Sequence, residues 1–186
     1  MAKVFIISGL SGSGKDSVID GLKQAGLDYH RIITTTTRPI RPGESQGNPY
    51  YFISEQEFKK MISQNEFFEW AVVYDNYYGN RIKTVEEALI GNRPIIFRID
   101  AQGARTVRKK ISDSIVIFLT AESLEKIKER LAKRNQDSPE VIEKRLAEAE
   151  QEMENLNQWD YVVINRQGKL KETINQVKEI IEKNFN

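Results

Sequence analysis

The sequence contains a glycine-rich segment, Gly9-Leu10-Ser11-Gly12-Ser13-Gly14-Lys15, that precedes residues with helical spacing. The apolar run Val4-Phe5-Ile6-Ile7 before it is typical of a buried strand. Where a strand, a glycine turn and a helix follow one another, backbone N–H groups converge on phosphate oxygens and the helix N-terminus adds a positive dipole. Lys15 would then reach the β- and γ-phosphates of a nucleotide. The segment therefore predicts a P-loop that binds a nucleoside triphosphate.

The residue after the lysine departs from the P-loop pattern. A Ser or Thr, whose hydroxyl contacts Mg²⁺, is expected there, but this chain has Asp16 followed by Ser17. Because a carboxylate oxygen is a hard ligand that suits Mg²⁺, Asp16 is itself a candidate metal ligand. Ser17 lies one position further along the helix, and we expect it to point elsewhere.

The elements that position this loop alternate along the chain. Apolar runs predict strands at Val4–Ser8, Arg31–Thr34, Ile95–Ile99, Ser114–Leu119 and Tyr161–Ile164. Helical spacing predicts helices at Asp16–Ala25, Gly103–Ile111, Ser123–Arg134, Pro139–Leu156 and Leu170–Asn184. Ser138 followed by Pro139 is typical of a helix start. This alternation predicts an α/β fold with a mostly parallel sheet that helices cover on both faces.

Two segments interrupt the alternation. Residues 34–80 are rich in Pro, Gly and aromatic side chains, and we interpret them as an inserted lobe. That lobe is predicted to contain strands near Tyr50–Ile53 and Phe67–Tyr74 and a short helix at Ser54–Gln64. From residue 122 to about 154 the chain is helical and rich in both charge signs. It is either a solvated helical hairpin or a mobile lid that carries Arg130, Arg134 and Arg145 over a phosphate site.

Composition excludes several other classes of function. The chain has 186 residues, a net charge of +1 and no cysteine, which excludes disulfides and thiolate metal sites. With so little net charge we expect no nucleic-acid partner, and no apolar run approaches the length of a membrane span. His30 is the only histidine, and we expect it near the start of a strand rather than in catalysis. A cytoplasmic protein without a signal peptide is the expectation.

Several further motifs occur together and in a consistent order. They are Thr34-Thr-Thr-Thr-Arg-Pro-Ile-Arg-Pro-Gly-Glu44, Gly47-Asn-Pro-Tyr-Tyr-Phe52, Phe68-Glu-Trp70, Asn76-Tyr-Tyr-Gly79, Ile99-Asp-Ala-Gln-Gly-Ala104 and Asp137-Ser-Pro-Glu-Val-Ile142. Over nearly the whole chain the sequence resembles the guanylate kinase family, whose members phosphorylate GMP with ATP. The resemblance implies an α/β fold of the P-loop NTPase type, with a parallel sheet core flanked by helices. It also implies one domain, 1–186, with its core at 1–33, 81–121 and 157–186, a GMP-binding lobe at 34–80 and a lid at 122–156.

The resemblance implies which residues bind GMP. Two arginines and two tyrosines would hold its phosphate, because guanidinium forks and hydroxyls donate to phosphate oxygens; these are Arg38, Arg41, Tyr50 and Tyr78. Glu69 would accept hydrogen bonds from the N1–H and 2-amino groups of guanine. Thr34 matches a family serine that contacts guanine O6. Asn80 replaces a family threonine, and its amide could also donate to O6.

Further roles follow from the same resemblance. Lys15, Arg134 and Arg145 match residues that stabilise the transferring phosphoryl group, and Arg130 would assist them. Asp100, at the end of a strand, would contact the nucleotide or a water bound to Mg²⁺. Asn165 resembles a family residue near the ATP adenine. The predicted ATP contacts are thus Gly9, Leu10, Ser11, Gly12, Ser13, Gly14, Lys15, Asp16, Ser17, Arg130 and Asn165.

Two charged residues depart from the family pattern. Asp16 stands where the family has a hydroxyl, and Arg98 stands where it has an acid. Strand alternation places Arg98 on the same side as Asp100, at a strand end that should neighbour the P-loop. The two changes are predicted either to compensate as an ion pair or to make Asp16 a direct Mg²⁺ ligand.

The sequence therefore predicts an enzyme that catalyses ATP + GMP ⇌ ADP + GDP, with Mg²⁺ as cofactor. Two alternatives remain open. Asp after the P-loop lysine resembles ribose 1,5-bisphosphate phosphokinase, which would not need Glu69 or the complete Thr-Arg-Pro-x-Arg motif. Asp16, Asn80 and Arg98 instead fit a non-catalytic guanylate-kinase-like module that binds partner proteins.

Overall fold

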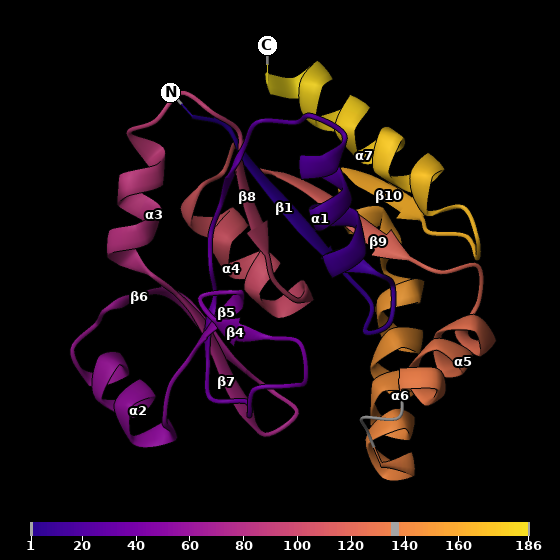
Figure 1. The fold of residues 1–186 in the computed structure, drawn as a ribbon, viewed down its shortest axis with the longest axis horizontal. Coiled ribbons are helices and arrows are strands. Elements are labelled where there is room, and N and C mark those ends of the chain that lie inside the picture. Colours follow the sequence, from indigo (N-terminus) through magenta and orange to yellow (C-terminus); the bar gives the residue numbers. More distant parts are fainter. Residues whose placement is uncertain (1, 135–137, 186) are drawn as a thin grey trace.

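The computed structural model describes residues 2–134 and 138–185, apart from the side chain of Arg134. Five parallel strands form the first sheet in the order β10-β9-β1-β8-β2 (Figure 1). They are β1 (Val4–Gly9), β2 (His30–Arg31), β8 (Ile95–Arg98), β9 (Ile115–Thr120) and β10 (Tyr161–Ile164). This sheet confirms the predicted α/β class and the parallel core.

Helices cover both faces of this sheet because its central strand is apolar on each side. Val4 and Ile6 of β1 face α3 (Ile82–Leu89) and α4 (Ala101–Lys110). Phe5 and Ile7 face α1 (Lys15–Gln24) and α7 (Leu170–Phe185). The two hydrophobic cores fix the P-loop between β1 and α1.

A second sheet contains the strands of residues 35–81, in the order β4-β5-β3-β7-β6. Its strands are β3 (Thr35–Thr36), β4 (Ser45–Gln46), β5 (Pro49–Phe52), β6 (Phe67–Val73) and β7 (Asn76–Arg81). Helix α2 (Glu55–Ser63) packs on it through Phe58, whose ring stacks on Phe67 at a centroid distance of 4.2 Å. The predicted helix and the two predicted strands of this segment are therefore present.

Two helices follow β9 and project from the same end of the first sheet as the second sheet does (Figure 1). They are α5 (Leu124–Arg134) and α6 (Pro139–Glu154), followed by a short 3₁₀ turn at Leu156–Gln158. Ser138 caps α6 by accepting a hydrogen bond from the N–H of Val141, and Pro139 occupies the first turn, as predicted. Asp137, which belongs to one of the family motifs, lies outside the described residues.

The strand predicted at Arg31–Thr34 is present only at Arg31, and its extension to Thr34 is wrong. His30–Arg31 pairs with β8 in the first sheet, and the chain joins the second sheet only at Thr35–Thr36. The predicted helix start at Gly103 is two residues late, because Asp100 caps α4 by accepting from the N–H of Gly103 at 2.7 Å. The prediction also missed α3 and β7.

Candidate functional site

The glycine segment forms a tight turn between β1 and α1. Gly9 has φ +141°, and a Cβ there would lie 2.0 Å from the carbonyl oxygen of Leu119. Gly14 caps α1 in the left-handed conformation with φ +90°. Lys15 begins the helix and donates through Nζ to the carbonyl oxygens of Gly9 and Leu10, at 2.7 and 2.9 Å. The lysine therefore folds back over its own loop, where a phosphate would sit.

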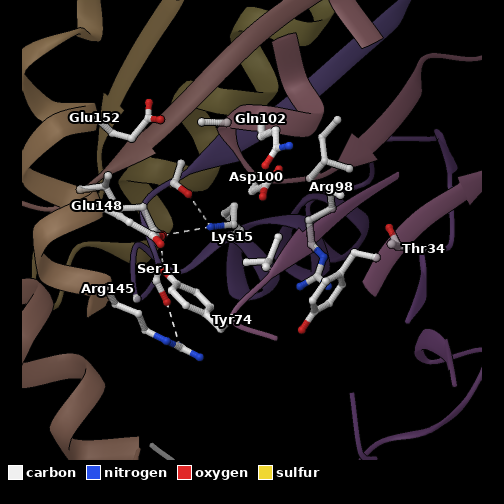
Figure 2. A pocket seen from close by; sticks show the side chains of 18 of the residues that line it. Ser11, Lys15, Thr34, Tyr74, Arg98, Asp100, Gln102, Arg145, Glu148 and Glu152 are labelled. Carbon is white, nitrogen blue, oxygen red and sulfur yellow. Dashed lines mark hydrogen bonds between the residues drawn. The ribbon is translucent and has the colours of Figure 1, made fainter. Parts of the chain in front are cut away.

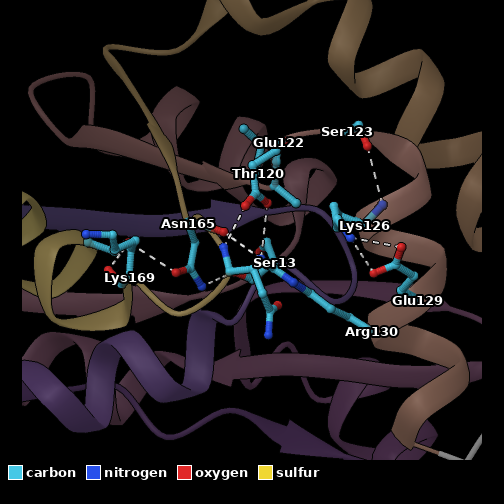
Figure 3. Close-up of polar contacts among 12 residues, drawn as sticks. Ser13, Thr120, Glu122, Ser123, Lys126, Glu129, Arg130, Asn165 and Lys169 are labelled. Carbon is cyan, nitrogen blue, oxygen red and sulfur yellow. Dashed lines mark hydrogen bonds and ion pairs between the residues drawn. The ribbon is translucent and has the colours of Figure 1, made fainter.

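Asn165, which follows β10, stabilises the glycine turn through hydrogen bonds (Figure 3). Its Nδ2 donates to the carbonyl oxygen of Ser13 at 2.8 Å, and its Oδ1 accepts from Thr173 at 3.1 Å. Its carbonyl oxygen accepts from Nη2 of Arg130 at 2.7 Å. A cavity of about 370 Å³ borders this part of the turn, and Ser17, Arg130 and Asn165 line it. The buried amide of Asn165 thus shapes the loop as well as lining this second cavity.

The larger cavity, of about 430 Å³, lies between the P-loop, the second sheet and α6 (Figure 2). Most of the residues predicted to contact phosphates or guanine line it. They are Gly9, Leu10, Ser11, Gly12, Gly14, Lys15, Asp16, Thr34, Arg38, Arg41, Tyr50, Glu69, Tyr78, Asp100 and Arg145. Ser17, as expected, lines the second cavity instead, together with Arg130 and Asn165. Residues from both sheets and from α6 therefore face one space.

A cluster of guanidinium and aromatic groups forms the second sheet's part of this wall. Arg38 donates through Nη2 to both carboxylate oxygens of Glu44, at 2.8 and 2.9 Å. Its Cζ lies 5.3 Å from the ring centroid of Tyr50, whose ring in turn meets Tyr78 edge-on at 5.8 Å. Glu44 also accepts from the backbone N–H of Arg41 at 2.8 Å. Glu44 ends the arginine motif but had no predicted role, and these contacts show that it orders both arginines.

Glu69 lies deeper in the same cavity, on β6, with only 5% of its surface exposed. Burial, reinforced by the nearby Asp100 carboxyl, raises the pKa of Glu69 to about 8. Asn80 donates through Nδ2 to Oε1 of Glu69 at 2.6 Å. Asn80 is fully buried and is not among the described residues that line the cavity. Its amide therefore hydrogen-bonds to the Glu69 carboxyl and does not face the cavity, where the predicted contact with guanine O6 would require it. Thr34 lines the cavity as predicted.

The end of β8 brings two charged residues to the P-loop. Arg98 lies beside Ile7 of β1 in register, and its Nη1 forms an ion pair with Oδ1 of Asp16. This contact confirms the predicted ion pair. Asp16 also lies 3.8 Å from Nη2 of Arg31, a second partner that the sequence did not indicate. Burial raises the pKa of Asp100 and lowers that of Arg98.

Helix α6 lines the cavity on the opposite side (Figure 2). Arg145 donates through Nη1 to Oγ of Ser11 in the P-loop at 2.9 Å, and its Cζ lies 4.5 Å from the ring centroid of Tyr74. The Tyr74 hydroxyl donates to Oε2 of Glu148 at 2.6 Å. Tyr74 and Glu148 were not predicted, since no local pattern connects residues 74 apart in sequence. The side chain of Arg134 lies outside the described part of the chain.

The acidic residues that line the larger cavity determine whether a metal ion such as Mg²⁺ could bind there. Among the described residues, no three acidic or histidine side chains gather into a cage for a metal ion. Asp16 and Asp100 nevertheless line the cavity that also contains Lys15. One or two carboxylates beside a phosphate site suit Mg²⁺, which keeps waters and takes further oxygens from the nucleotide.

Comparisons with known proteins agree with this geometry. A family model described as guanylate kinase matches residues 1–184. The guanylate kinase of Hydrogenovibrio crunogenus is 43% identical over 162 residues, which are 87% of this chain and 79% of that protein. The guanylate kinase of Buchnera aphidicola is 42% identical over 180 residues, 96% of this chain and 86% of that protein. The crystal structure of guanylate kinase from Anaplasma phagocytophilum matches with a TM-score of 0.80 and 26% identity, over 98% of this chain and 85% of that one. The chain therefore belongs to the guanylate kinase family.

Proposed function

We propose that this protein transfers the γ-phosphoryl group of ATP to GMP. The observation that carries the proposal is the single cavity that joins Lys15 of the P-loop to Glu69 and the arginine–tyrosine cluster. A triphosphate on the P-loop and a purine monophosphate beside the second sheet would thus meet within one space. The relatives named above are called guanylate kinases, which agrees with this pair of substrates.

The acceptor would lie against the second sheet. Its phosphate would accept hydrogen bonds from Arg38, Arg41, Tyr50 and Tyr78, because guanidinium and hydroxyl groups suit phosphate oxygens. The carboxylate of Glu69 would accept from the adjacent N1–H and 2-amino groups of guanine. Adenine offers an acceptor at N1 and no 2-amino group, so it would leave the buried carboxyl without these partners. Sites built on such bonds discriminate by up to about 10⁴–10⁵.

The donor would lie along the P-loop. Backbone N–H groups of residues 9–15 and the N-terminus of α1 would hold the phosphates, with Lys15 on the β- and γ-phosphates. The second cavity, next to Arg130 and Asn165, would receive the nucleoside of ATP. Mg²⁺ would be held by Asp16 and by Asp100, the latter through water; when bound, it would neutralise phosphate charge.

Transfer needs no protein nucleophile. Phosphoryl transfer depends on positioning and charge neutralisation, and an arginine in this role contributes about 10³–10⁵ in rate. Arg145 already contacts the P-loop serine, and Arg134 is proposed to join it. Closure of α6 over the cavity would exclude water, so that the phosphoryl group passes to GMP rather than to hydrolysis.

An assay of ADP release separates this function from its alternatives. The protein would be supplied with ATP, Mg²⁺ and, in turn, GMP, IMP, AMP or ribose 1,5-bisphosphate. We expect turnover with GMP to exceed that with AMP by several orders of magnitude, and Glu69→Gln to reduce it far more than it weakens ATP binding. Turnover with ribose 1,5-bisphosphate alone, or none with any acceptor, would refute the proposal.

A further inference from the structure

Arg98 is a buried cation in the middle of the cavity wall. Its side chain is only 7% exposed, and Figure 2 shows it reaching into the cavity between Lys15 and Thr34. Its Cζ lies 4.3 Å from the ring centroid of Tyr50, closer than the Cζ of Arg38 to the same ring. The guanidinium is therefore held by a cation–π contact with Tyr50 and by an ion pair with the carboxylate of Asp16.

The ion pair with Asp16 does not account for this placement. The side chain of Asp16 is 50% exposed, so solvent would serve the carboxylate if Arg98 were absent. A second guanidinium, that of Arg31, also lies 3.8 Å from Asp16. Burying a guanidinium is costly, and Arg31 and Arg38 add repulsion, which together with burial lowers the pKa of Arg98. Positive charge is thus concentrated where an anion with more than one charge would be stabilised.

Tyr50 connects this cation to the acceptor site. In the proposed function its hydroxyl donates to the phosphate of the monophosphate. The Cζ of Arg98 lies 4.3 Å from the centroid of that ring, and both side chains line the same cavity as the P-loop. A phosphate that accepts from Tyr50 therefore comes within reach of Arg98.

We propose that Arg98 donates directly to the phosphate of the acceptor, as a third arginine beside Arg38 and Arg41, on the side from which the γ-phosphoryl group arrives. The proposal rests on the proposed function, because it assumes a monophosphate in this cavity. When the acceptor enters, Arg98 exchanges part of its contact with Asp16 for a phosphate oxygen. Asp16 then turns to the donor side of the cavity.

The test must separate this role from simple neutralisation of Asp16. We would therefore measure binding in the Asp16→Ser background, in which the carboxylate is absent, and compare it with Asp16→Ser/Arg98→Gln. Isothermal calorimetry would be performed with GMP and with guanosine, which lacks the phosphate. Loss of one charge-assisted hydrogen bond should weaken GMP binding by about 10- to 100-fold and change guanosine binding less than twofold.

Equal GMP affinity in the two variants would overturn the proposal, and so would an equal loss for GMP and guanosine, since that loss would indicate a structural role. Asp16→Ser/Arg98→Met offers the same comparison with the aliphatic stem retained, should the Gln variant not fold. Asp16→Ser/Arg98→Lys should recover part of the loss for GMP. A wild-type protein that binds ATP but not GMP would refute the proposed function itself, which is a different result from equal affinities.

Discussion

The ionisation of Glu69 predicts how GMP binding depends on pH. Burial raises the pKa of this carboxyl to about 8, so in the free protein at pH 6 about one molecule in 100 carries the carboxylate. Guanine presents two donors and binds the charged form, so binding must release the proton. The dissociation constant should therefore fall about tenfold between pH 6 and pH 7, about 50-fold in all between pH 6 and pH 8, and then level off.

Calorimetry at pH 6, 7, 8 and 9 measures this dependence, with guanosine as the control ligand. The second ionisation of a phosphate, near pH 6, contributes to GMP binding but not to guanosine binding. Glu69→Gln is the matched variant, because it keeps the shape of the side chain and removes the ionisation. We expect its guanosine affinity to be low and independent of pH. A wild-type profile that is flat from pH 6 to pH 8, or the same slope in the Gln variant, would refute the reasoning.

Three further predictions concern stability and closure. Because the pKa of Glu69 is higher in the folded protein than its ordinary value of 4.5, wild-type stability should fall as pH rises from about 4.5 through 8; urea unfolding of Glu69→Gln should show a smaller fall. Tyr74→Phe removes the hydrogen bond to Glu148, so kcat/KM for GMP should fall about 3- to 10-fold while the calorimetric affinity for GMP stays within twofold. Gly9→Ala would place a Cβ 2.0 Å from the carbonyl oxygen of Leu119, and urea unfolding should show a loss of at least about 2 kcal/mol.

Local chemistry made the core of the site predictable. The glycines and Lys15 indicate a tight turn because few other residues adopt its backbone conformation, and the apolar run before it is a buried strand. The pairing of Asp16 with Arg98 was also predictable, because both depart from the family pattern at neighbouring ends of two elements. In each case the informative residues lie on or next to regular elements whose geometry is known in advance.

The predictions failed where tertiary contacts override local preference. The threonine run after Arg31 has strand propensity throughout, yet the chain changes sheets within it, and only pairing with β5 and β7 decides where. Helix α3 has a helical pattern, since Ile82, Val85 and Leu89 share one face, but it lies between two predicted strands and no element is predicted there. The direction of the Asn80 amide depends on the burial of Glu69, which no sequence pattern reports.

Three of the cations that line the cavity have partners within the protein. Lys15 donates hydrogen bonds to two carbonyl oxygens, Arg38 forms a salt bridge with Glu44, and Arg98 forms one with Asp16. A small anion that meets only one of these groups gains little, because it displaces a contact about as good as the one it makes. A ligand that replaces several partners at once has the advantage of all its contacts together. These internal contacts thus favour a ligand that engages several cations together over a small anion that engages one, so selectivity begins before any base is recognised.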